Sequence, residues 1–112
     1  MITIEQLKEI QQRADKLKQY LAIDEKRVQL EEEELRTQDP GFWEDAKAAE
    51  AQMRKVKGIK AWIEGYEGVR AATEELQLAF DYCKEELVTE DEVDAAYAHA
   101  IKEVEALEMK NM

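Results

Sequence analysis

Residues 59–87, with the sequence IKAWIEGYEGVRAATEELQLAFDYCKEEL, decide the fold class of this 112-residue chain. Apolar or small side chains recur here at alternating steps of three and four residues, which places them on one face of a helix. Glycines at positions 58, 65 and 68 fall in this pattern, and each weakens a helix by up to about 1 kcal/mol relative to alanine. Because the face keeps its register past them, we predict one helix over about residues 45–87, weakened or bent near the glycines but not ended there. The face consists of Ile59, Trp62, Tyr66, Val69, Thr73, Leu76, Phe80, Cys83 and Leu87.

The same spacing marks a helix toward each end of the chain. It predicts a first helix at about residues 4–21 and a last helix at about residues 90–109. Each begins with a capping box, in which two side chains satisfy free backbone N–H groups of the first turn. The capping pairs are Thr3–Gln6 and Thr89–Glu92, and the apolar faces are Leu7, Ile10, Ala14, Leu17 and Leu21, then Val93, Tyr97, Ala100, Val104 and Leu107.

A further helix is expected at about residues 25–37. Asp24 is its predicted N-cap, since a carboxylate accepts hydrogen bonds from the N–H groups of the next turn. The sequence leaves open whether this helix is separate from the first or joins it through a bend. Its acidic run, residues 31–34, is interpreted as a solvated face, because neighbours in sequence point to different sides of a helix and do not gather around a metal. Its apolar positions are Val28, Leu30 and Leu35, and Ile23 with Val28 has the spacing of a hydrophobic staple.

Asp39-Pro40-Gly41 is the clearest break in the chain, because proline cannot continue a helix and glycine permits a tight turn. Phe42 and Trp43 follow at once. Two large aromatic side chains beside a turn usually dock into a core and set the direction in which the chain leaves the turn. We therefore assign Asp39, Pro40, Phe42 and Trp43 as structural anchors.

These elements predict an all-α fold. No segment alternates apolar and polar residues over a useful length, so we expect no β-sheet. Only a short connection fits between the last two helices, which should therefore lie antiparallel. The prediction is a single domain over residues 1–112, an elongated antiparallel bundle of three to four helices with coiled-coil-like packing.

The charge balance limits the partners. The chain has 16 Lys and Arg against 27 Asp and Glu, a formal net charge of −11, so phosphate backbones and anionic membranes repel it. A single cysteine excludes an internal disulfide and a four-cysteine zinc site. No apolar run is long enough to span a membrane, and the first residues do not have the pattern of a signal peptide.

Residues with catalytic potential are few. His99 lies near the edge of the last helix's face without a recognisable nucleophile partner, and we interpret it as a surface residue. Cys83 falls on the apolar face among carboxylates, which suits a small buried hydrophobe better than a reactive thiolate. Residues 65–68 lack the lysine and hydroxyl side chains of a phosphate-binding loop. We expect no catalytic residue, no cofactor and no metal site.

One local excess of positive charge stands out. Residues 52–70 carry a net charge of +3, whereas residues 74–112 carry −9. The cations either pair with acidic neighbours in the bundle or form a docking surface for RNA or an acidic protein. We name the candidate contact surface the basic patch; it consists of Arg54, Lys55, Lys57 and Lys60.

Residues 13–43, RADKLKQYLAIDEKRVQLEEEELRTQDPGFW, resemble the start of the bacterial peptide chain release factors of the release factor 2 kind. Those proteins have a Leu-x-x-Tyr-Leu-like end to the first helix, then an Asp-led helix rich in Glu. An Asp-Pro-x-Phe-Trp element follows, with an acidic residue and an Ala-rich helix after it. The matching residues are Leu17, Tyr20, Leu21, Asp24, Leu30, Glu31, Asp39, Pro40, Phe42, Trp43, Asp45, Ala46 and Ala49.

The resemblance implies a docking domain of a cytoplasmic translation termination factor. Such factors recognise UGA or UAA stop codons on the ribosome and promote peptidyl-tRNA hydrolysis through a Gly-Gly-Gln motif. Neither that motif nor the codon-reading Ser-Pro-Phe-like tripeptide occurs here, so we expect a fragment that is not itself an enzyme. The implied partners are the stalk-base region of the large ribosomal subunit and the partner GTPase release factor. We also expect limited RNA contact through the basic patch, no membrane contact and a monomer.

Two other classes of function stay open. A free-standing helical scaffold or chaperone-like protein-binding bundle would expose an apolar strip and self-associate. A small helical enzyme would need a polar cluster with shifted pKa values inside the bundle, which the apolar faces do not indicate.

Overall fold

The computed structural model describes residues 1–112 and contains four α-helices, one short 3-10 helix and no strand. The prediction of an all-α, elongated fold is confirmed, since the principal extents are 60 × 28 × 18 Å. None of the helices has the length and apolar content needed to cross a membrane. The elements in chain order are α1 (Ile4–Tyr20), α2 (Ile23–Arg36), η1 (Phe42–Glu44), α3 (Ala46–Lys84) and α4 (Glu90–Lys110).

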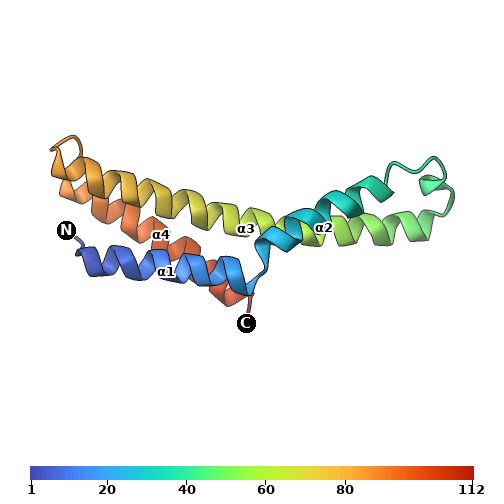
Figure 1. Ribbon diagram of the computed structural model, residues 1–112, viewed down its shortest axis with the longest axis horizontal. Coiled ribbons are helices and arrows are strands. Elements are labelled where there is room, and N and C mark those ends of the chain that lie inside the picture. The colour runs from blue at the N-terminus through green and yellow to red at the C-terminus, as the bar shows by residue number, and fades with distance from the viewer.

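Helix α3 runs through the whole length of the molecule, and the other helices pack along it (Figure 1). Its 39 residues would measure about 58 Å at 1.5 Å per residue, close to the long dimension of the molecule. Helices α1, α2 and α4 all run in the direction opposite to α3. We call α1, α4 and residues 62–84 of α3 the body, and α2, η1 and residues 46–61 of α3 the arm.

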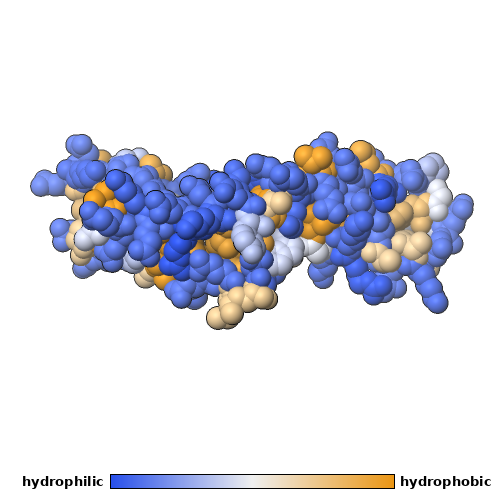
Figure 2. All heavy atoms as spheres, turned by 60° about the horizontal axis from the view of Figure 1, so that its bottom comes forward, coloured by the Kyte–Doolittle hydropathy of each residue, from blue (hydrophilic) through white to orange (hydrophobic).

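The apolar faces predicted from the sequence form the core of the body. All five predicted positions of α1 are buried, and Val69, Leu76, Val93 and Val104 are fully enclosed between the helices. The core of the arm is smaller and separate, with Ala49, Val56 and Ile59 buried on its side of α3. The surface of the molecule is mainly hydrophilic on the face shown in Figure 2, with apolar side chains in scattered patches.

Helix α3 continues through its three glycines, as the unbroken register predicts. A Cβ atom at Gly65 would lie 3.0 Å from Leu107 Cδ1 of α4, closer than ordinary van der Waals contact. The missing side chain at this position therefore lets α4 approach α3 closely.

Helices α1 and α2 are separate, and the predicted N-cap of α2 is wrong. The helix begins at Ile23, and Ala22 occupies the cap position in the left-handed conformation, with φ 50° and ψ 52°. Asp24 lies in the first turn, 3.9 Å from Arg27. Ile23 is fully buried in the core. To place Ile23 in the core, the chain turns sharply at Ala22, and α2 therefore begins one residue before Asp24.

Helix α3 ends at Lys84, three residues before the predicted end. The N–H of Leu87 donates to the carbonyl of Tyr82 at 3.0 Å, and the N–H of Glu86 donates to Cys83 at 3.1 Å. These two bonds form a Schellman motif, with Glu86 in the left-handed position at φ 59°. Leu87 lies beyond this turn and is exposed, so its predicted place on the apolar face is wrong.

The expectation that both aromatics beside Pro40 enter the core is wrong for Trp43. Its side chain is 69% exposed and meets Phe42 edge-to-face, with the ring centroids 4.7 Å apart. Phe42 is half-buried. Residues 37–45 lie at the outer end of the arm (Figure 1), where only two helices meet and no third helix covers the turn.

We expect Glu86→Gly to raise the free energy of unfolding by roughly 0.5–1 kcal/mol, measured by urea denaturation. Glycine adopts the left-handed conformation without strain, and the change also removes an acidic charge at a helix carboxyl end. Glu85→Gly is the matched control, because it removes a neighbouring charge from a residue at φ −94° and should destabilise the protein. Equal effects of the two changes would contradict strain at residue 86.

Trp43→Ala should lower the free energy of unfolding by less than about 1 kcal/mol, because little of the side chain is buried. Leu76→Ala provides the contrast. This residue is fully enclosed, and its truncation should cost about 2–5 kcal/mol. A loss of more than about 2 kcal/mol at Trp43 would show that the tip of the arm is packed more tightly than the exposed ring implies.

Candidate functional site

The basic patch lies on the α3 side of the arm, and all four of its residues are exposed. Three of them are already engaged in ion pairs. Arg54 pairs with Glu50 one turn away on α3 at 3.3 Å, whereas Lys55 and Lys60 reach α2. Only Lys57 has no acidic partner. The structure therefore shows intramolecular pairing for three of the four cations, and the free positive charge is smaller than the sequence alone indicates.

Glu33 is the acidic residue that organises this part of the arm. The residue is only 5% exposed, although it belongs to the acidic run predicted as a solvated face. Gln52 Nε2 donates to Glu33 Oε2 at 2.7 Å and to the Glu33 carbonyl at 2.9 Å. Lys55 and Arg36 lie 3.3 and 3.8 Å from its other carboxylate oxygen. The prediction of solvation is thus wrong for Glu33, which joins α2 to α3.

The pKa of Glu33 is lowered from the ordinary glutamate value. The hydrogen bond from Gln52 is the main cause, and Lys55 and Arg36 act in the same direction, whereas burial acts against them. Gln52 and Lys55 stand three residues apart on α3 and therefore face α2 together. We call Gln52, Lys55 and Arg36 the clamp around Glu33. The spacing of Gln52 and Lys55 is the one signal in the sequence that could have indicated it.

Glu34, the next residue, ties a second cation of the basic patch to α2. Its carboxylate lies 3.4 Å from Lys60 Nζ, and both side chains are close to half exposed. Solvent weakens such a pair, so it contributes little to stability and holds Lys60 only loosely.

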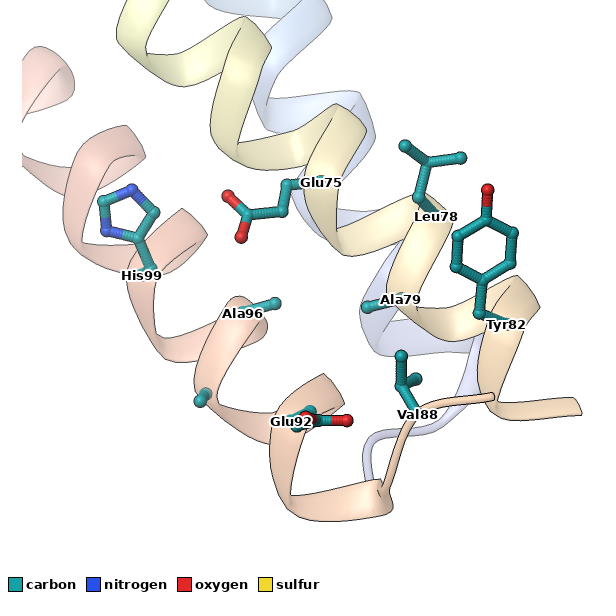
Figure 3. A pocket seen from close by; sticks show the side chains of 9 residues that line it. Glu75, Leu78, Ala79, Tyr82, Val88, Glu92, Ala96 and His99 are labelled. Carbon is teal, nitrogen blue, oxygen red and sulfur yellow. The ribbon is translucent and has the colours of Figure 1, made fainter. Parts of the chain in front are cut away.

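The largest hollow of the molecule lies elsewhere, between α3 and α4 in the body (Figure 3). We call it the groove; its volume is about 500 Å³. Small and apolar side chains form its floor and walls, and acidic residues and the only histidine stand at its edges. The lining residues are Glu75, Leu78, Ala79, Tyr82, Val88, Glu92, Ala95, Ala96 and His99.

Neither residue considered for chemistry in the sequence has a catalytic setting. His99 is exposed at the edge of the groove, and Glu75 extends from α3 toward the helix that carries it (Figure 3). Cys83 is a free, half-buried thiol packed against the core of the body. No three His, Cys, Asp or Glu side chains are grouped as a metal ion would need, and every buried side-chain nitrogen and oxygen has a hydrogen-bond partner.

The geometry defines an elongated helical domain with two kinds of exposed surface, a partly paired basic patch on the arm and an acidic apolar groove on the body. The peptide chain release factor 2 of Pseudoalteromonas translucida (strain TAC 125) is 30% identical to this chain over 113 residues. The match covers 97% of the chain but only 30% of that relative. No protein-family model and no solved structure matches the chain.

The similarity is distant, and it relates the chain to the release factor family. It extends over all four helices, whereas the weight of the resemblance in the sequence lies in residues 13–50. The chain spans less than a third of the length of the curated relative that it matches.

We expect Glu33→Gln to reduce the pH dependence of stability. Because the pKa of Glu33 is lowered in the folded protein, its contribution is present above the ordinary glutamate pKa and is lost as the pH falls through the lowered value. The free energy of unfolding in urea, measured between about pH 7 and about pH 3, should therefore fall less in Glu33→Gln than in the unchanged protein.

Glu32→Gln is the control for this measurement, because Glu32 is exposed on the same helix and makes no ion pair. If both variants respond to pH as the unchanged protein does, the clamp around Glu33 does not act on the folding equilibrium.

Proposed function

We propose that this chain is the docking domain of a translation termination factor. The observation that carries the proposal is the 30% identity to a release factor 2 over 97% of the chain. The full-length factor would recognise UGA or UAA stop codons on the ribosome and promote peptidyl-tRNA hydrolysis. Within it, this domain would make contacts only, in the cytoplasm, and would act without catalytic residues or cofactors of its own.

The shape supports a role in contact rather than in catalysis. A rod 60 Å long with two separate cores can reach between two sites on a large assembly. Its open hollow is lined mainly by small and apolar side chains, which suits the docking of a protein surface better than the positioning of a reacting group. We infer that the domain contacts the stalk-base region of the large subunit and the partner GTPase release factor.

The arm is the proposed ribosomal contact, through the basic patch. Lys57 has no partner, and Arg54 has only an exposed pair within its own helix, so both can exchange water or Glu50 for an RNA phosphate. Lys55 and Lys60 are held toward α2 and would contribute less. Asp39, Pro40 and Phe42 would fix the turn at the tip, and Trp43 would be free to contact a partner there.

Co-sedimentation of the 112-residue chain with bacterial ribosomes tests this proposal. We expect salt-sensitive binding that Arg54→Glu with Lys57→Glu weakens at least about fivefold, since each reversal replaces an attraction to phosphate by a repulsion. Lys16→Glu with Lys102→Glu is the matched control, because both of these lysines are exposed on the body and unpaired. Their reversal should change the affinity by less than about twofold.

A monomeric chain that binds ribosomes weakly agrees with the proposal. A stable dimer without affinity for ribosomes would overturn it and favour the free-standing helical scaffold. Equal loss of binding in the two charge-reversed variants would show that net charge, and not the basic patch, governs the contact.

A further inference from the structure

The groove lies on a face of the α3–α4 pair that no helix of the chain covers. Helix α1 packs against the same two helices on another side, and Figure 3 shows it behind them, away from the hollow. The three helices of the body thus leave room for one more helix, as in a four-helix bundle. The shape of the surface fits a helix better than an extended strand, because no sheet edge is present for a strand to join.

The lining of the groove suits the apolar face of such a helix. Ala79 of α3 and Ala96 of α4 lie between the two helices in the groove, and their short side chains let another backbone come close (Figure 3). Leu78 and Tyr82 form one wall and stay 52% and 46% exposed, which is unusual for large apolar side chains beside a core. Six of the nine lining residues are hydrophobic, and exposed apolar surface rimmed by polar residues is a feature of protein interaction sites.

The charge around the groove selects the class of partner. Two of the nine lining residues are acidic and none is a lysine or arginine, and the stretch that contains them, residues 71–99, has a net charge of −8. Glu75 and Glu92 stand directly at the edges of the groove. A nucleic acid, an anionic membrane and the same surface of a second copy would all be repelled, whereas a positively charged helix would be attracted.

We propose that the groove binds a cationic amphipathic helix of a partner protein. The apolar side of the helix would lie on Leu78, Ala79, Tyr82 and Ala96. Its lysine or arginine residues would flank the contact and meet Glu75 and Glu92. The proposal does not depend on the role in translation termination, because it rests on the shape, apolar lining and charge of the groove alone.

A synthetic helical peptide of about 18 residues, made only of leucine and lysine with the leucines on one face, is a suitable probe. Its affinity for the full 112-residue chain would be measured by titration calorimetry. The control peptide has the same composition with the leucines spread around the helix, so its net charge is identical. We expect the amphipathic peptide to bind at least about tenfold more tightly than the control peptide.

Two double variants then test whether the peptide binds at the groove or elsewhere on the surface. Leu78→Ser with Tyr82→Ser should weaken binding at least about tenfold, since truncation of central apolar contacts has effects of this size. Val28→Ser with Leu35→Ser removes two comparably exposed apolar side chains from the arm and should change the affinity less than about twofold. All four residues are exposed, so both variants should keep the helical circular dichroism of the unchanged chain.

The acidic edges are tested in the same way. Glu75→Gln with Glu92→Gln should weaken binding at least about threefold at low salt, and the difference should shrink as salt is added. A glutamine at position 92 would keep the capping box with Thr89, because its side-chain oxygen accepts the same backbone hydrogen bond. Glu31→Gln with Glu32→Gln removes the same charge from the arm and should have less than half of that effect.

Four results would overturn the proposal. They are the absence of peptide binding, equal binding of the two peptides, equal weakening by the groove and arm variants, and a dimer of the chain that Leu78→Ser with Tyr82→Ser dissociates. The last result would make a second copy the occupant of the groove. None of these results bears on whether the basic patch binds ribosomes, so the two proposals fail independently.

Discussion

The apolar face of α3 is the surface on which every other helix of the chain depends. Helices α1 and α4 pack on its carboxyl-terminal half, and α2 packs on its amino-terminal half. Helix α3 is the only helix that runs through both the body and the arm, and Ile23 at the start of α2 adds a second link because it is buried in the core of the body. At Gly65 of α3 the missing side chain leaves room for Leu107 of α4, whose Cδ1 would lie 3.0 Å from an added Cβ atom.

The two halves stabilise themselves by different means. The body has three helices and encloses a long apolar core, so hydrophobic burial dominates there. The arm has two helices, encloses little apolar surface, and adds the hydrogen-bonded carboxylate of Glu33 between them. A buried carboxylate with several donors favours one alignment of the two helices, because a shift of either helix would leave the charge without partners.

The fold class and both capping boxes could be predicted from the sequence, because apolar spacing and capping are local properties. The number of helices was open between three and four, because the sequence does not decide whether α1 and α2 are separate. The exceptions depend on what lies across the molecule. Burial of Ile23 sets the start of α2, and Trp43 stays exposed because no third helix reaches the tip. Of the candidate surfaces, the basic patch was visible as a charge excess, but its pairing with α2 was not. The groove was missed because alanines on a helix have no distinctive pattern until the neighbouring helix is placed.

The separate core of the arm also bears on how the molecule opens. Protein segments with few buried apolar contacts unfold locally at a lower free energy than the rest of the chain, and amide hydrogens report this as faster exchange. With Ala49, Val56 and Ile59 as its buried apolar residues on α3, the arm would form a cooperative unit of lower stability than the body. A partner bound to the arm would then slow amide hydrogen exchange in the arm more than in the body. The measured affinity would be reduced by the free energy needed to hold the arm in its folded state. The body would thus stay folded while the arm opens and closes locally.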